Sequence, residues 1–397
     1  MKLIQRTAYL DRLIRLKGTP DMKVITGIRR SGKSRLLLSY MEWLKVEHPR
    51  CNIIFIDLQS LENESLREYH ALHQAVKERF QAGTDNCLII DEIQLCPQFE
   101  LAVNSLHSKG KYDIYLTGSN AFLLSSDLAT LFTGRVIQIE VLPFSFSEYR
   151  LYFDEEPDIQ AGFDRYVETG GFAGCYPYHS EKDRTEYVNE VYRTIVRRDL
   201  VDRYHLPDTM MLGRLAEYMM DNVSNVTSPN SITDCLVSDG NLTNRTTIAR
   251  YMEHLEHAYM FYPVSRYDVR GRKYLQSLGK YYIVDSGMRY AVLGRRNMDY
   301  GRVYENLVYL ELRRRGYDIY VGKLYQKEID FVCMRSSEKL YIQVSDNISE
   351  EDTFLREVTP LLQIRDAYPK ILIARTRHPE YDWQGVRIID LATWLAG

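Results

Sequence analysis

Residues 27–34, Gly-Ile-Arg-Arg-Ser-Gly-Lys-Ser, place the strongest constraint on the fold of this chain. They match the pattern G-x-x-x-x-G-K-[ST], which forms the phosphate-binding loop of nucleoside triphosphatases. A β-branched run precedes them at residues 23–26, and a leucine-rich stretch that we expect to be helical follows at residues 35–44. A strand, a glycine-bearing turn and a helix N-terminus together direct backbone N–H groups at a phosphate chain. The sequence therefore predicts an ATP site at this loop.

The match to the phosphate-loop motif predicts roles for individual residues. Its whole length and the first residue of the helix are expected to surround the nucleotide: Gly27, Ile28, Arg29, Arg30, Ser31, Gly32, Lys33, Ser34 and Arg35. Lys33 is expected to act in catalysis by reaching the β- and γ-phosphates, and Ser34 is expected to bind Mg²⁺. Arg29 and Arg30 contact phosphates or a neighbouring subunit in one interpretation and are solvated surface charges in the other.

A second apolar run, residues 86–92, ends in the two carboxylates Asp91 and Glu92. Such a run is typical of a parallel strand that is buried on both faces. Asp91 is then expected to bind the Mg²⁺ shell, and Glu92 is expected to act in catalysis by polarising the attacking water. The alternative is a surface strand end with two solvated acids.

Two further strands are expected in the same sheet, at residues 52–57 and 112–117. The second runs into polar residues, and a polar side chain at such a strand end is placed to sense the γ-phosphate. Thr117, Ser119 and Asn120 are the candidates, of which Ser119 is preferred. An ordinary polar turn is the alternative for each of them.

Composition narrows the class of protein. The 397 residues are enough for two to four domains, and 45% hydrophobic with 26% charged residues is typical of a globular chain. A net charge of −3 and a pI of about 6.3 give no global basic field, so a nucleic-acid site must be a local patch. Six cysteines without C-x-x-C spacing favour reduced thiols and a cytoplasmic location. We expect neither a membrane span nor a secretory signal.

Five motifs together resemble one protein family. They are the phosphate loop, Ile-Ile-Asp-Glu-Ile-Gln at 89–94, Leu-Thr-Gly-Ser-Asn at 116–120, Thr-Gly-Arg at 133–135 and Leu-Pro-Phe-Ser-Phe-Ser-Glu-Tyr at 142–149. In combination they resemble the AAA-type P-loop ATPases of bacteria and archaea that carry a conserved C-terminal domain of unknown function. The resemblance extends over essentially the whole chain.

The resemblance implies an AAA-like core, ATP as the ligand, and Arg135 as a catalytic arginine that contacts the γ-phosphate. In related proteins such an arginine often completes the site of the next subunit in a ring, and Arg135 acts either in this way or within its own chain. A pair with a carboxylate is the alternative role of Arg135. The oligomeric state stays open.

The chain is therefore expected to be an α/β protein in four parts. They are a P-loop ATPase domain with an AAA-like parallel sheet at 1–149, a helical lid at 150–206, a winged-helix domain at 207–290 and a nuclease-like α/β domain at 291–397. Within the lid, residues 168–174 form a glycine-rich break between helices.

The winged-helix interpretation rests on a third helix at residues 243–255 that is followed by a basic hairpin turn. Phosphate contacts to DNA are expected from five basic residues: Arg245, Arg250, Arg270, Arg272 and Lys273. The alternative is a winged helix that only packs or contacts a protein partner.

The last part has a helix, three strands, a helix and a strand in the order of the PD-(D/E)XK nuclease core. Glu305 and Asp330 match two of the metal-binding acids of that core, but Gln343 and Ser345 replace the third-strand acid and lysine. Three other lysines are candidates for the missing cation: Lys323, Lys327 and Lys339. A catalytically silent binding module is the preferred interpretation, and an active nuclease is the alternative.

These parts predict an ATP-binding protein and Mg²⁺-dependent ATPase that acts as a switch or motor, with DNA as a candidate partner. An ATP-gated PD-(D/E)XK-type nuclease is the first alternative. A regulatory protein-binding switch with slow turnover is the second, and it requires a protein partner.

Overall fold

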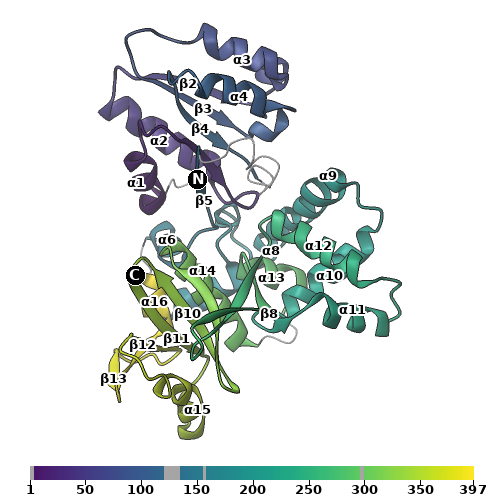
Figure 1. Ribbon diagram of the computed structural model, residues 1–397, viewed down its shortest axis with the longest axis vertical. Coiled ribbons are helices and arrows are strands. Elements are labelled where there is room, and N and C mark those ends of the chain that lie inside the picture. Colours follow the sequence, from purple (N-terminus) through teal and green to yellow (C-terminus); the bar gives the residue numbers. More distant parts are fainter. Residues whose placement is uncertain (1–3, 120–134, 155–157, 296–298) are drawn as a thin grey trace. The chain divides into compact units, whose positions relative to one another are not determined.

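The computed structural model describes residues 4–119, 135–154, 158–295 and 299–397. The chain divides into two compact units (Figure 1). The first unit comprises Met1–Leu142 with His257–Tyr259, and the second comprises Pro143–Glu256 with Met260–Gly397.

A five-stranded parallel sheet forms the centre of the first unit, in the order β2-β3-β4-β1-β5. Its strands are β1 (Met22–Thr26), β2 (Asn52–Asp57), β3 (Asn86–Asp91), β4 (Asp113–Thr117) and β5 (Val136–Glu140). All residues of β1 and β3 are buried, as expected for parallel strands that are covered on both faces. The predicted parallel α/β domain is thus confirmed.

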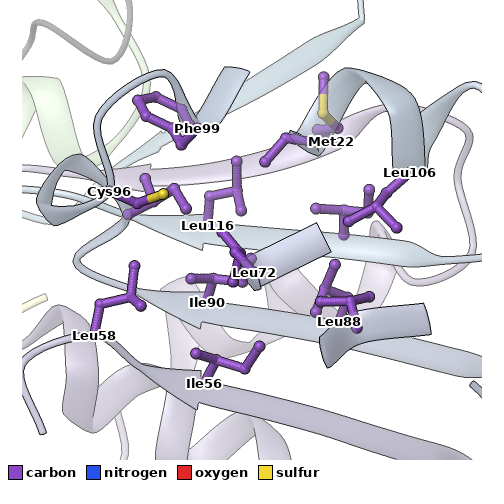
Figure 2. Packing of buried hydrophobic residues seen from close by; sticks show 14 of the residues in the cluster. Met22, Ile56, Leu58, Leu72, Leu88, Ile90, Cys96, Phe99, Leu106 and Leu116 are labelled. Carbon is purple, nitrogen blue, oxygen red and sulfur yellow. The ribbon is translucent and has the colours of Figure 1, made fainter. Parts of the chain in front are cut away.

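Helices cover both faces of this sheet (Figure 1). They are α1 (Thr7–Arg15), α2 (Lys33–Glu47), α3 (Tyr69–Glu78) and α4 (Phe99–His107), with the 3-10 turns η1 (Leu61–Arg67) and η2 (Ile93–Leu95). Alternate strand residues point to opposite faces. Ile25 therefore packs with α1 and α2, while its neighbour Val24 packs in the cluster with α3 and α4. Figure 2 shows this second cluster, in which Leu88 and Leu116 of the sheet lie among Leu72 and Phe99 of the helices.

Short helices begin the second unit, where the helical lid was predicted. They are α6 (Phe146–Tyr152), α7 (Ile159–Thr169), the 3-10 turn η4 (Ala173–Cys175), α8 (Glu181–Thr194), the π-helical turn η5 (Ile195–Val201) and α9 (Asp202–Tyr204). The predicted glycine-rich break lies between α7 and α8. A Cβ atom on Gly171 would lie 2.2 Å from the carbonyl oxygen of Phe144, and the Gly171 N–H donates to Asp285 at 2.5 Å. The close packing of the backbone therefore requires glycine at position 171.

The next elements follow the order that the winged-helix interpretation expects. They are α10 (Thr209–Asp221), β6 (Val226–Thr227), α11 (Pro229–Ser238), α12 (Arg245–His257), β7 (Phe261–Asp268) and β8 (Lys273–Ile283). Strands β6 and β7 both pair antiparallel with β8, and β7 also pairs in parallel with β9 (Asp318–Leu324). The hairpin of β7 and β8 is thus part of a larger sheet. The winged-helix interpretation stays a prediction.

That larger sheet has nine strands in the order β13-β14-β12-β11-β10-β9-β7-β8-β6. The remaining elements of the unit are α13 (Ser286–Leu293), α14 (Tyr300–Arg314), β10 (Lys327–Arg335), β11 (Glu338–Ser345), α15 (Glu351–Leu362), β12 (Lys370–Ala374), β13 (Tyr381–Trp383), β14 (Val386–Asp390) and α16 (Leu391–Ala396). The sheet is continuous across the predicted boundary at residue 290. Within the described ranges, no helix combines the length and the apolar character that crossing a membrane requires.

Candidate nucleotide-binding site

The phosphate loop connects β1 to α2 at the carboxyl edge of the parallel sheet. Gly27 has a φ of 130° and Gly32, directly before α2, has a φ of 101°. Glycine adopts such angles without steric penalty, whereas other residues rarely do. A Cβ atom on Gly27 would in addition lie 2.3 Å from the carbonyl oxygen of Val141. The loop therefore depends on glycine at its first position.

The beginning of α2 has the features of an anion site. Gly32 is the N-cap residue and offers no side-chain cap, and N–H groups at such a helix start are typical anion ligands. The Ser31 hydroxyl oxygen is buried and has no hydrogen-bond partner among the described residues. An uncapped helix N-terminus beside an orphaned buried hydroxyl fits the phosphate chain of ATP.

Lys33 is buried, with 4% of its surface exposed. Its Nζ donates to the carbonyl oxygens of Gly27 at 2.9 Å and Ile28 at 3.0 Å, so the ammonium group lies inside the loop. Ser34 and Arg35 are exposed on the first turn of α2. Within the loop, Arg30 is exposed and Arg29 is half-buried.

Arg6 is a neighbour of the loop that the sequence analysis missed. Its side chain is 4% exposed, and Nη1 donates to the carbonyl oxygen of Ser31 at 2.9 Å. The guanidinium group also lies 4.5 Å from the ring centroid of Tyr9, a cation–π distance. No motif marks Arg6, because it precedes the loop by 21 residues and reaches it only through the packing of α1.

Thr117, the last residue of β4, bonds to both acids at the carboxyl end of the neighbouring strand β3. The register pairs Ile90 with Leu116, which makes Asp91 and Thr117 neighbours. Thr117 donates its hydroxyl hydrogen to Oδ1 of Asp91 and accepts the backbone N–H of Glu92 at 2.8 Å. All three residues are buried, with exposures of 5% for Asp91, 7% for Glu92 and 0% for Thr117. One hydroxyl group therefore positions the whole acidic pair.

The three predicted γ-phosphate sensors are placed differently. Thr117 contacts the acids, Ser119 is buried two residues further on, and Asn120 lies outside the described residues. The Gly118 N–H donates to Ile25 of β1 at 3.1 Å, so the segment that contains Ser119 leaves the sheet beside the strand that carries the loop. Sensing by Ser119 stays a prediction.

Arg135 lies at the opposite edge of the sheet from the phosphate loop of its own chain. Its carbonyl oxygen accepts the N–H of Met22, the first residue of β1, at 2.8 Å. The loop follows Thr26, the last residue of β1. Four residue steps along a parallel strand span about 13 Å. The Arg135 side chain is exposed at this edge.

The second unit contains a buried charge cluster around the predicted nuclease-like residues. Glu305 of α14 and Asp330 of β10 do lie together, with exposures of 8% and 7%. Lys280 of β8 joins them: its Nζ lies 2.9 Å from Glu305, 2.8 Å from Glu328 and 3.7 Å from Asp330. Tyr282 also donates to Glu305, at 2.6 Å. The cation of the cluster is therefore a residue that the sequence analysis did not consider.

The two residues that replace the nuclease motif on β11 make ordinary structural bonds. Oε1 of Gln343 accepts the N–H of Asp330 at 3.3 Å, and the Ser345 hydroxyl donates to the carbonyl oxygen of Asn347 at 3.0 Å. The three lysines that were candidates for the missing cation lie elsewhere on the sheet: Lys323 and Lys327 are exposed, and Lys339 is half-buried.

Burial and neighbouring charges both shift the pKa values of the groups in this cluster. Burial raises the pKa of the Glu305 carboxyl, while Lys280 and Tyr282 lower it. Burial and the nearby Glu305 raise the pKa of Asp330 well above its usual range. Burial alone lowers the pKa of Lys280, but the three carboxyl groups together raise it above its ordinary value. The lysine therefore stays an ammonium ion at neutral pH.

The five basic residues predicted to contact DNA are all exposed, on two different elements. Arg245 and Arg250 lie on α12, and Arg270, Arg272 and Lys273 lie at the turn between β7 and β8. The Arg270 guanidinium group lies 5.0 Å from the ring centroid of Tyr325. Their exposure is compatible with phosphate contacts, and DNA binding stays a prediction.

Within the part of the chain that the structure describes, no three His, Cys, Asp or Glu side chains are arranged to hold a metal ion. Mg²⁺ at a nucleotide site is commonly bound through one or two carboxylates together with substrate phosphates. The assignment of Asp91 and Ser34 to that role stays a prediction.

We expect Thr117→Val to destabilise the first unit. Valine has the shape of threonine but cannot pair with Asp91 or accept the buried N–H of Glu92, and an unpaired buried group costs about 1–3 kcal/mol. The free energy of unfolding, measured by urea denaturation, is expected to fall by about that amount. Thr117→Ser keeps the hydroxyl and should lose less. A valine variant as stable as the wild type would contradict the bridging role of Thr117.

Comparison with known proteins supports this picture. Residues 19–150 match the AAA domain family, and residues 160–299 match a domain of unknown function (DUF8612). An uncharacterized protein of Haemophilus influenzae is 35% identical over 398 residues, which cover 99% of this chain and 98% of the relative. An uncharacterized protein of Methanocaldococcus jannaschii is 26% identical over 367 residues, which cover 88% and 80%.

Among solved structures, AMPPCP-bound DnaA from Aquifex aeolicus is 15% identical and has a TM-score of 0.31, covering 64% of this chain and 88% of that one. A likeness of this size supports no functional inference. The AAA match contains the phosphate loop, both acids and Arg135, and the Haemophilus relative matches nearly end to end. The chain therefore belongs to the same family as the Haemophilus influenzae protein, and in this chain an AAA domain with a P-loop is followed by a domain of unknown function.

Proposed function

We propose that this chain is a Mg²⁺-dependent ATPase that works as a switch or motor, with DNA as the partner of its second unit. The observation that carries the proposal is the convergence of three strand ends at one edge of the sheet. The phosphate loop follows β1, Asp91 and Glu92 follow β3, and Thr117 of β4 bonds to both acids. This arrangement supports the assignment of ATP hydrolysis to the first unit.

Each of these residues has a distinct task in the proposed reaction. The N–H groups at the start of α2 bind phosphate oxygens, and Lys33 balances their negative charge. Ser34 and Asp91 hold Mg²⁺, which, when bound, neutralises charge on the phosphates. Glu92 orients the attacking water and accepts its proton. Ser119 contacts the γ-phosphate in this proposal.

We expect Lys33→Ala to abolish Mg²⁺-dependent ATP turnover, because the phosphates then lose the buried ammonium group. The measurement is phosphate release with and without duplex or single-stranded DNA. Lys45→Ala, an exposed lysine further along α2, is the matched control and should keep wild-type turnover.

We also expect DNA to stimulate the wild type, and the double substitution Arg245→Ala with Arg250→Ala to remove that stimulation.

Two outcomes would redirect this proposal. Tight ATP binding without any turnover in the wild type would exclude the ATPase. Turnover that does not respond to DNA would favour the regulatory switch that binds a protein partner.

We further propose that Arg135 serves the nucleotide site of a neighbouring copy of the chain. Its backbone lies one strand length, about 13 Å, from the loop of its own chain, and its side chain is exposed. In this proposal Arg135 meets the γ-phosphate of a second molecule, where it stabilises the charge of the transition state.

Mixing two inactive variants tests this assignment. Arg135→Ala lacks the arginine and Lys33→Ala lacks a working loop, so each alone is expected to be inactive. A mixed assembly contains interfaces at which an intact arginine faces an intact loop, and turnover should therefore reappear when the two are combined. A mixture as inactive as its components would show that Arg135 acts within its own chain, and Arg135→Ala with wild-type turnover would show that it does not act at all.

The buried charge cluster favours a silent binding module over an active nuclease. The ammonium group of Lys280 lies within 4 Å of all three carboxyl groups, so a divalent cation there would meet a resident positive charge. We propose that the cluster is structural and fastens β8 to α14 and β10.

Lys280→Met is the corresponding test, because methionine keeps the apolar stem and removes the charge. Leaving the carboxyl groups without a cation is expected to destabilise the protein by about 3–5 kcal/mol in chemical denaturation. Lys327→Met, an exposed lysine of β10, should change stability by less than about 0.5 kcal/mol.

The wild type should leave DNA intact with Mg²⁺ or Mn²⁺. Cleavage that Asp330→Ala abolishes would establish the nuclease instead.

A further inference from the structure

Tyrosine rings gather on the nine-stranded sheet of the second unit, where β7, β8 and β9 lie side by side. The ring centroid of Tyr274 on β8 lies 5.5 Å from that of Tyr267 on β7 and 5.0 Å from that of Tyr320 on β9. The ring planes meet at 65° and 48°, so neither neighbour stacks face to face on Tyr274. The Tyr274 side chain is 62% exposed. A flat aromatic surface is therefore open to solvent at this place.

Lys339 of β11 adds a positive charge to the same group of rings. Its Nζ lies 4.9 Å from the ring centroid of Tyr267, 5.0 Å from that of Tyr341 and 5.5 Å from that of Tyr368. These are cation–π distances. Within the described ranges, Lys339 forms no ion pair with a carboxylate at 4.0 Å or less. The fold thus holds this ammonium group by aromatic rings and leaves its charge without a close counter-ion.

The turn between β7 and β8 presents further cations beside the rings. Oδ1 of Asp268 accepts the N–H of Arg270 at 3.1 Å and the N–H of Gly271 at 2.8 Å, so the first part of the turn is fixed. Arg272 and Lys273 follow directly, and both are exposed. The hydrogen bonds of the turn therefore position a basic edge next to the aromatic surface.

The charges of Arg272 and Lys339 act on each other. Burial lowers the pKa of Lys339, the nearby Asp366 raises it, and Arg272 lowers it again, so that the pKa lies below its ordinary value. The Asp366 carboxylate has other partners, because it accepts the Tyr341 hydroxyl at 2.6 Å and lies 3.9 Å from Nζ of Lys370. An anion that contacts both cations would relieve their repulsion. This place therefore favours a phosphate group.

We propose that this surface binds single-stranded DNA, with an unpaired base stacked on Tyr274 and phosphates in contact with Lys339 and Arg272. We call it the tyrosine–lysine patch, and it consists of Tyr267, Tyr274, Tyr320, Tyr368, Arg272 and Lys339. The proposal rests on the proposed function, in which DNA is the partner of the second unit, and it adds the form of DNA that is bound.

The combination of rings and cations favours a single strand over a duplex. Exposed aromatic rings beside a basic edge are typical of proteins that bind unpaired strands, since every base has a face that can stack. In a duplex the base faces are covered by the neighbouring base pairs, and only the base edges are accessible in the grooves. A duplex would therefore use the cations of the patch but not its rings.

Fluorescence anisotropy of the full chain without nucleotide tests the patch. The probes are a labelled oligothymidine of about 16 nucleotides, a strand of the same length without bases, and a duplex of the same length. We expect the oligothymidine to bind at least about tenfold more tightly than either of the others, because only its bases can stack. Equal affinity for the strand without bases, or tighter binding of the duplex, overturns the proposal.

Substitutions separate the stacking from the charge. Tyr274→Leu removes the ring and should weaken oligothymidine binding about tenfold, while its unchanged affinity for the strand without bases shows that the protein is intact. Tyr274→Phe should bind as the wild type does. Lys339→Met should weaken both strands, because it removes a phosphate contact. Tyr381→Leu is the matched control, an exposed tyrosine of β13 at the other end of the sheet order. Wild-type oligothymidine affinity in Tyr274→Leu overturns the patch.

The patch and the proposed function can fail separately, since binding is measured without ATP. Oligothymidine that binds through Tyr274 but does not stimulate turnover would leave the patch in place and contradict the DNA-coupled ATPase. A duplex that stimulates turnover while oligothymidine does not bind would overturn the patch and leave the proposed function. A wild type that binds none of the three probes would also overturn the patch, and would favour a protein partner.

Discussion

The parallel pairing of β1, β4 and β3 is the constraint on which the nucleotide site depends. In a parallel sheet all carboxyl ends lie at one edge, so the loop after β1 and the acids after β3 are brought to the same edge with only β4 between them. Thr117 uses that intermediate position, because its single hydroxyl group bonds to Asp91 and to the backbone of Glu92. A shift in the register of β4 would remove both bonds at once. The positions of the loop and of both acids therefore depend on the pairing of the strands.

The parts of the site that the sequence predicted are those whose signal is local. The loop and the acidic pair are short contiguous motifs at the ends of apolar runs, and the structure places both at the ends of buried strands. Lys280 was missed for the opposite reason. It begins a tyrosine-rich strand segment and looks like a solvent-facing residue, and its partners come from α14 and β10, at sequence separations of 25 to 50 residues. Arg6 was missed in the same way, since only the packing of α1 brings it to Ser31. Non-local pairing carries no signature in a single sequence.

The phosphate loop with its acids and the Lys280 cluster are two buried charged sites that differ in how their charges are balanced. In the second unit Lys280 lies among three carboxyl groups and every partner is a protein side chain. In the first unit Lys33 bonds to carbonyl oxygens of its own loop, and Glu92 bonds to an amide. These bonds are made to neutral groups, whereas the Lys280 cluster pairs full charges of the fold with one another. This contrast favours the first unit as the place of the reaction.

Two residues with a strained backbone lie where that reaction would occur. Arg30 in the loop and Glu92 after β3 both have positive φ, although neither is glycine. The strands that precede them are buried throughout and supply the stability that keeps these conformations in place. A rigid sheet can hold strained ends because the free energy needed is small compared with that of a packed core. Because these residues lie beyond the strand ends, a change of their partners does not require the sheet to unfold. In the proposed ATPase the sheet is thus the fixed part of the site, and the loop and the acidic turn are the parts that would respond to ATP.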